Sequence, residues 1–163
     1  MPNNRLEERP SLSITRRYDA SPEKVWRAWT DPEAMKEWWK PDDTYSPLVT
    51  EADVRVGGRF RVLMISPEGK EHDVSGVYLE LIPNRKLVFT WVGKATSERE
   101  TLVTVTLRPS GSGTELELKH EHFFNTEDRD SHQEGWSGCL TVLEHFLAKL
   151  GDTITRRRND DSK

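Results

Sequence analysis

The feature that most constrains this chain is a change in the spacing of its apolar residues. From about Pro47 to Glu121 apolar and polar residues alternate, whereas from Trp136 to Leu150 apolar residues recur every three or four positions. The first spacing is typical of half-buried strands and the second of an amphipathic helix. Glycine and proline clusters divide the alternating region into six expected strands. We therefore expect a sheet followed by one long helix.

Two short helices are expected before the sheet. Ser21-Pro22-Glu23 and Asp31-Pro32-Glu33 each place a capping oxygen before a proline, whose missing N–H costs nothing in a first helical turn. The first helix should end near Trp29 and the second near Trp39-Lys40-Pro41. A strand from Ser11 to Tyr18 should come before both.

The closing helix has a start signal and a stop signal. Ser131 can cap it, with Glu134 three residues later as a capping-box partner, and Gly151 follows Leu150 as a stop. Its apolar stripe is wide enough to pack on a sheet. The stripe consists of Trp136, Cys139, Leu140, Leu143, Phe146, Leu147 and Leu150.

This order of elements predicts an α+β fold. We expect a curved antiparallel sheet of about seven strands that grips the long C-terminal helix, with two short helices after strand 1. Bulges at Gly57-Gly58 and Gly76 would help the sheet to curve. The 163 residues are enough for one domain, expected at residues 11–151, with flexible tails at 1–10 and 152–163.

Composition argues against several classes of protein. The net charge of −4 and the lack of a clustered basic stripe argue against nucleic acid as a partner. One cysteine cannot form an internal disulfide, and the chain has neither a secretory h-region nor a run of about 18 apolar residues. We expect a cytoplasmic protein without a membrane span.

Several segments together resemble a known family. They are Ala20 to Pro32, Trp38-Trp39, Asp53 to Phe60, Gly76 to Glu80, Leu87 to Trp91 and Gly135-Trp136. From about Ile14 to Leu150 the chain resembles bacterial single-domain members of the activator-of-90-kDa-heat-shock-protein-ATPase homology family, in the START-like helix-grip superfamily (SRPBCC).

The resemblance implies a deep, mainly apolar pocket between the sheet and the C-terminal helix. The superfamily uses this pocket for lipids, polyketides and other hydrophobic molecules, with catalysis only in some branches. The co-chaperone that gives the family its name has an additional N-terminal domain. Here about ten residues precede the first expected strand, which argues against a chaperone partner.

The expected function is binding of a small hydrophobic or amphipathic molecule in that pocket, without a cofactor. Aromatic residues would supply contact area, and His120 with Tyr78 would orient the ligand; plain core packing is the alternative for each residue. Strand alternation points His120 inward. The expected pocket residues are Trp38, Phe60, Met64, Tyr78, His120, Trp136, Leu140 and Leu143.

A metal site and a nucleophile are not expected. His120, His122, His132 and Glu134 could approach one another, but their spacing matches no established zinc pattern. Cys139 lies on the buried stripe, where apolar surroundings would make its thiol inert.

Two other functions remain open. A cyclase-, hydrolase- or dehydratase-type enzyme would need pocket histidines and carboxylates, and Asp73, Glu80 or Glu134 would serve only if they point inside. An interaction module, co-chaperone-like or acting in a stress response, would show an exposed apolar patch and a filled core. No catalytic residue is assigned, and a homodimer is compatible with every alternative.

Overall fold

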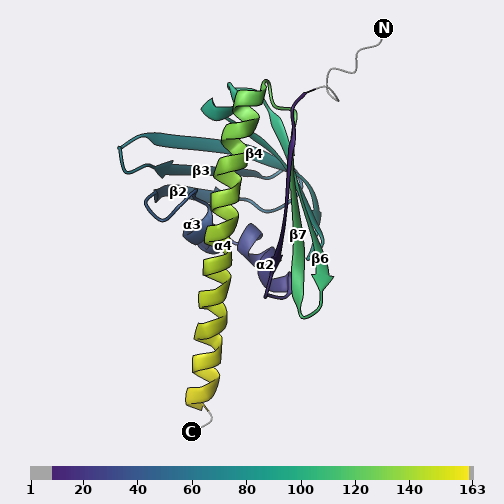
Figure 1. Ribbon diagram of the computed structural model, residues 1–163, viewed down its shortest axis with the longest axis vertical. Coiled ribbons are helices and arrows are strands. Elements are labelled where there is room, and N and C mark those ends of the chain that lie inside the picture. The colour runs from purple at the N-terminus through teal and green to yellow at the C-terminus, as the bar shows by residue number, and fades with distance from the viewer. Residues whose placement is uncertain (1–8, 162–163) are drawn as a thin grey trace.

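The structure is a computed structural model that describes residues 9–161, with side-chain surroundings for residues 9–150. Within them, seven strands form one sheet and three α-helices lie against it (Figure 1). The strands are β1 (Leu12–Tyr18), β2 (Ser46–Ala52), β3 (Arg59–Ile65), β4 (Glu71–Ile82), β5 (Lys86–Gly93), β6 (Thr101–Ser110) and β7 (Gly113–Glu121). The helices are α2 (Pro22–Thr30), α3 (Pro32–Trp38) and α4 (Thr126–Asp161), with a 3₁₀ turn η1 (Lys94–Thr96).

The sheet has the strand order β1-β7-β6-β5-β4-β3-β2, and every neighbouring pair is antiparallel. It bends around α4, so that β1 and β7 lie on one side of the helix and β2 and β3 on the other (Figure 1). The inward residues of β7, Leu116, Leu118 and His120, are fully buried, as strand alternation predicts. The predicted helix-grip α+β fold is confirmed.

The two short helices begin where the sequence predicts. Ser21 Oγ accepts a hydrogen bond from the backbone N–H of Lys24, and Pro22 occupies the first turn of α2. Asp31 caps α3 in the same way, accepting from Glu33 N–H at 3.0 Å. Each cap thus satisfies a backbone N–H of the first turn that has no partner within the helix.

Helix α4 is longer than predicted at both ends. Asn125, rather than Ser131, caps its start, since Asn125 Oδ1 accepts from Asp128 N–H at 2.8 Å. Gly151 does not stop it, because the helical backbone continues to Asp161. A single glycine costs a helix only about 1 kcal/mol, so Gly151 alone is not enough to end it. The last turns extend beyond the sheet (Figure 1).

The predicted tails fall largely on parts that the structure leaves undescribed. Residues 1–8 and 162–163 lie outside the described residues, and residues 152–161 are described as helical backbone without side chains. Flexibility of the tails therefore stays a prediction. None of the helices in the described part of the chain has an apolar stretch long enough to cross a bilayer.

One of the two predicted bulges is present. Where β3 begins, Gly57 and Gly58 lie opposite the single residue Tyr78: the N–H of Gly57 donates to the Tyr78 carbonyl at 2.8 Å, and the N–H of Tyr78 donates to the Gly58 carbonyl at 2.9 Å. Gly57 has φ +86°, as the first residue of such a bulge requires. The bulge predicted at Gly76 is wrong, because Gly76 pairs regularly with Phe60, and a side chain there would overlap the Thr90 carbonyl. Further register shifts lie between Pro47 and Val49, and between Tyr78 and Glu80.

An aromatic cluster fills the middle of the space between the sheet and α4. Neighbouring rings in it have centroids 4.6 to 6.4 Å apart, within the range of favourable aromatic contact. The aromatic cluster consists of Trp29, Trp38, Trp39, Phe60, Tyr78, Phe89, Trp91 and Trp136. It ties α2, α3, three strands and α4 into one core.

Candidate functional site

A cavity of about 550 Å³ lies beside the first turns of α4. This volume is within the range of sites that bind small molecules. Its walls come from the α3–β2 loop, strands β3, β4 and β5, the turn η1 and helix α4. The lining residues are Trp39, Lys40, Pro41, Asp42, Tyr45, Met64, His72, Val74, Trp91, Ala95, Ser131, His132, Glu134, Gly135, Trp136, Gly138 and Cys139.

Three indoles form the apolar floor. The centroid of Trp91 lies 5.0 Å from that of Trp136 and 5.9 Å from that of Trp39. Met64 and Val74 extend this surface along β3 and β4, where they share the inward face. The floor is thus the edge of the aromatic cluster where the packing of the core ends.

His132 forms a polar part of the wall and is held neutral. Its Nδ1–H donates to the backbone carbonyl of Asp128 at 2.8 Å, and its Nε2 accepts from the indole N–H of Trp91 at 3.2 Å. Burial lowers the pKa of His132, because the charged ring would lose hydration without gaining an acceptor. Both ring nitrogens are therefore already in use.

His120 lies behind this wall in a second neutral arrangement. Its Nδ1 accepts from the indole N–H of Trp136 at 3.0 Å, which places the proton of the neutral ring on Nε2. Nε2 then donates to Thr101 Oγ1 at 2.7 Å, and the Thr101 hydroxyl donates to the carbonyl of Trp91 at 2.6 Å. Burial, with His132 nearby, holds the pKa of His120 well below its usual value.

His72 and Tyr45 form the rim on the sheet side. Their rings lie 5.4 Å apart, and both line the cavity. Partial burial lowers the pKa of His72, and Lys70 acts in the same direction. A neutral imidazole beside a phenol gives this rim groups that can donate or accept a hydrogen bond.

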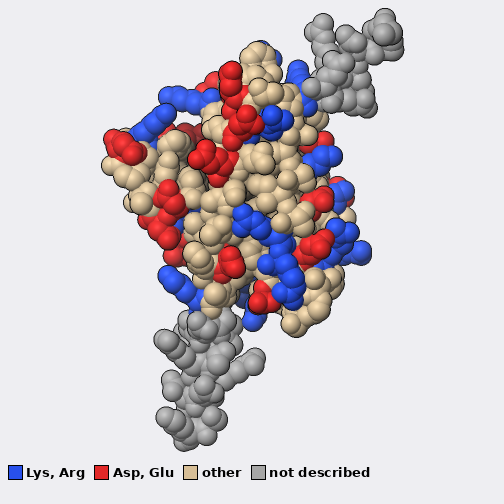
Figure 2. Space-filling view, viewed as in Figure 1, with Lys and Arg blue, Asp and Glu red and all other residues tan. Residues whose placement is uncertain are grey.

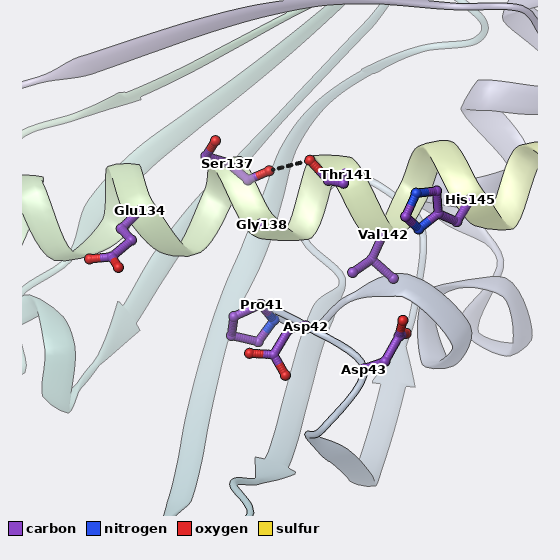
Figure 3. Close-up of a pocket in the computed structure, with 9 residues that line it drawn as sticks. All are labelled: Pro41, Asp42, Asp43, Glu134, Ser137, Gly138, Thr141, Val142 and His145. Atoms are coloured by element: carbon purple, nitrogen blue, oxygen red, sulfur yellow. Dashed lines mark hydrogen bonds between the residues drawn. The ribbon is translucent and has the colours of Figure 1, made fainter.

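On the other side of the α3–β2 loop, a groove of about 410 Å³ runs along α4 (Figure 3). The groove meets the cavity at Gly138, which lines both and lies so close to the loop that a side chain there would overlap the carbonyl oxygen of Pro41. Asp42 and Glu134 border both spaces. In Figure 3 Glu134 extends from α4 on the side that faces the loop, so the two carboxylates stand on opposite walls.

The structure brings only part of the predicted pocket together. Met64 and Trp136 line the cavity. The other six residues are buried in the core behind it and do not line it: Trp38, Phe60, Tyr78, His120, Leu140 and Leu143. Ligand contact by any of the eight stays a prediction.

Sequence reasoning missed much of the wall. The missed residues include His72, His132 and the loop from Lys40 to Tyr45. Inward alternation in β4 was a usable signal for Val74, which shares the face of Gly76 and Tyr78. No local pattern shows that the α3–β2 loop folds back against α4.

The candidate acids differ in their surroundings. Asp73 pairs with Arg61 at 2.9 Å and Glu80 with Lys86 at 3.4 Å, so both are engaged away from the cavity. Of these three acids, only Glu134 borders the cavity. Cys139 lies 3.6 Å from the carbonyl of Trp38, and burial raises its thiol pKa, which makes the thiolate scarce.

The predicted histidine constellation does not assemble as a metal site. His122 has φ +72° just after β7 ends, so the alternation that would place it beside His120 is broken. Across the described residues, no group of three histidine, cysteine or acidic side chains has the geometry to hold a metal ion.

Comparison with known proteins gives a consistent family. Residues 19–148 match the family model described as Activator of Hsp90 ATPase homolog 1-like protein. A Mus musculus protein, described as activator of 90 kDa heat shock protein ATPase homolog 2, is 31% identical over 110 residues. The match covers 66% of this chain and 29% of the relative, so the chain spans less than a third of that protein's length.

Solved structures share the fold over nearly their whole length. A Chromobacterium violaceum protein is 28% identical with a TM-score of 0.77, and the match covers 90% of this chain and 98% of that one. A Nitrosomonas europaea protein is also 28% identical, with a TM-score of 0.73 and coverage of 87% and 96%.

Proposed function

The chain belongs to the Activator of Hsp90 ATPase homolog 1-like family, and we propose that it binds a small hydrophobic or amphipathic molecule in the cavity beside α4. The observation that carries this proposal is the form of the cavity. It has a floor of three indoles and a rim that includes His72 and Glu134. Such a surface suits a ligand with an apolar body and a polar end.

The expected affinity is modest without polar contacts. Burying about 200 Å² of apolar ligand surface contributes roughly 5 kcal/mol before association costs. Micromolar binding requires about 8 kcal/mol, so hydrogen bonds at the rim must contribute. Tyr45 and His72 are placed to supply them.

A neutral fluorescent amphiphile, N-phenyl-1-naphthylamine, tests the proposal directly. We expect saturable binding with one site per chain and an emission increase as the dye leaves water. Ala95 on η1 is exposed and lines the cavity, so Ala95→Trp should narrow it without disturbing the core. The variant should bind the dye at least about tenfold more weakly, the effect expected of excluding a few methylene-sized groups.

The matched control is Ala148→Trp, at an exposed position of α4 that lines neither space. It should bind the dye like the parent. The proposal fails if the parent shows no saturable binding, or if both variants weaken binding equally while circular dichroism shows them folded.

The enzymatic alternative has less support. Titratable groups do border the cavity, but His132 would have to break hydrogen bonds to Trp91 or Asp128 before it could move a proton. We therefore propose no catalytic residue.

A further inference from the structure

We infer that the ligand of this cavity is a cationic amphiphile, whose apolar body lies on the indole floor and whose ammonium-type head lies between Asp42 and Glu134. The inference rests on the proposed function and adds the chemical class of the ligand. It is carried by the composition of the walls and by the position of the two carboxylates.

The floor favours a positive charge over a negative one. Trp39, Trp91 and Trp136 present aromatic surface to the cavity, and the faces of aromatic rings attract cations. Met64 and Val74 add apolar area beside them. An organic cation that carries its own apolar groups can use both kinds of surface, whereas a small hydrated ion cannot.

Carboxylates outnumber cations where the cavity meets the groove. Asp42 and Glu134 border both spaces, and Asp43 borders the groove. Among the residues that line the cavity or the groove, Lys40 carries the positive charge. Its Nζ lies 3.8 Å from Asp43 Oδ1. Lys40 also lies near enough to Asp42 to help lower its pKa, after the hydrogen bonds from Thr44, so one cation faces three carboxylates and a net negative charge remains for a ligand.

The carboxylate of Asp42 is charged and held in place. Its Oδ1 accepts hydrogen bonds from the backbone N–H and the hydroxyl of Thr44, and these bonds lower the Asp42 pKa. A carboxylate has about four acceptor positions, so room remains for an ammonium donor. The histidines of the wall, His72 and His132, have lowered pKa values and add no opposing charge at neutral pH.

The path of the chain fixes where a head group would lie. Gly138 allows α4 to approach Pro41 closely, so cavity and groove meet at this contact. Glu134 stands one helical turn before Gly138, and Asp42 follows Pro41. A head that leaves the indole floor towards the groove therefore meets one carboxylate from each wall (Figure 3). Figure 2 shows acidic side chains gathered over this half of α4.

Three probes with one body and different heads test the inference: 4-phenylbutylammonium, 4-phenylbutanol and 4-phenylbutanoate. Each is titrated into the 163-residue protein at pH 7.5, with the six indole N–H resonances followed by NMR. We expect the ammonium to bind about three- to tenfold more tightly than the alcohol, and the carboxylate more weakly than both. The preference should shrink in 1 M NaCl, because salt screens exposed charges.

Variants locate the head group. Glu134→Gln combined with Asp42→Asn should bring the ammonium within about twofold of the alcohol, compared as the ratio of the two affinities on the same variant. Glu144→Gln is the matched control, an exposed carboxylate of α4 that borders neither space. It should leave the preference intact.

The outcomes separate this inference from the proposed function. If all three probes bind equally, or the carboxylate binds best, the cationic head is wrong while a ligand cavity stands. If the double variant and Glu144→Gln lower the preference alike, the position of the head is wrong. If no probe binds, both proposals fail.

Discussion

The indole N–H of Trp136 donates to Nδ1 of His120 at 3.0 Å, and this bond sets the state of a buried imidazole. A protonated His120 would carry N–H groups on both ring nitrogens, so its Nδ1–H would face the indole N–H. The same holds for His132, whose Nε2 accepts from Trp91 at 3.2 Å. Burial and the two indole donors thus keep both histidines neutral, His132 in the wall of the cavity and His120 behind it.

Removing the indole donor should destabilise the protein. Trp136→Phe leaves Nδ1 of buried His120 without its partner and opens space in the core. We expect a loss of about 2–4 kcal/mol in the free energy of unfolding, measured with urea at pH 7.5. Trp26→Phe, at a half-buried position of α2, should cost less than half as much. Equal losses would show that the hydrogen bond to His120 contributes nothing specific.

Stability should fall as the pH drops below about 6.5. His72, His120 and His132 have pKa values below the ordinary 6.5 in the folded protein, so below that pH the unfolded chain binds more protons. The free energy of unfolding therefore decreases as pH falls from the unfolded-state pKa towards the folded-state values, and it is insensitive to these groups above about pH 7. Urea midpoints from pH 8 to pH 5 measure this dependence.

His132→Gln identifies one source of that dependence. The amide can accept from Trp91 but does not titrate, so the slope between pH 6.5 and pH 5 should be shallower than in the parent. Ala148→Gln, which places the same amide at an exposed position of α4 without removing a titrating group, is the control and should leave the slope unchanged. A slope that His132→Gln does not alter would assign the acid sensitivity to other groups.

Two glycines of α4 should respond in opposite directions to alanine. Nothing lies within 4 Å of a side chain added at Gly135, so Gly135→Ala should stabilise the protein by up to about 1 kcal/mol through helix propensity. A side chain at Gly138 would overlap the carbonyl oxygen of Pro41, and Gly138→Ala should cost about 1–3 kcal/mol. Thermal unfolding of both variants decides this. If Gly138→Ala is as stable as Gly135→Ala, the close approach of the loop to α4 is wrong.

The fold was predictable because its signals are local and agree with one another. Ser21 with Pro22 and Asp31 with Pro32 specify helix starts through their own side chains and rings. The alternation of apolar and polar residues along β3 predicts that Phe60 points inward, and Phe60 is buried. Gly151 misled because one glycine is tolerated within a helix.

The cavity could not be located in the same way. Whether an inward aromatic residue packs in the core or lines a cavity depends on what faces it from another element. Tyr78 and Trp136 both point inward, but only Trp136 stands where the core packing ends. The loop that carries Asp42 meets α4 because Gly138 leaves room for Pro41, a relationship between residues far apart in the sequence. The spacing of residues along the chain does not predict such a contact.

Two buried tyrosines provide a matched test of the core. The hydroxyl of Tyr18 donates to the carbonyl of Leu140 in α4 at 2.9 Å, whereas the buried hydroxyl of Tyr78 has no partner within the described residues. Tyr18→Phe removes a hydrogen bond and leaves a carbonyl less satisfied, so it should lower the free energy of unfolding by about 1–2 kcal/mol. Tyr78→Phe removes a hydroxyl that is desolvated without compensation, so it should be neutral or stabilising by up to about 1 kcal/mol. Urea unfolding of the two variants at pH 7.5 measures the difference between these free energies. If both substitutions destabilise the protein equally, the hydrogen bond from Tyr18 in β1 to Leu140 in α4 does not contribute the stability argued for it.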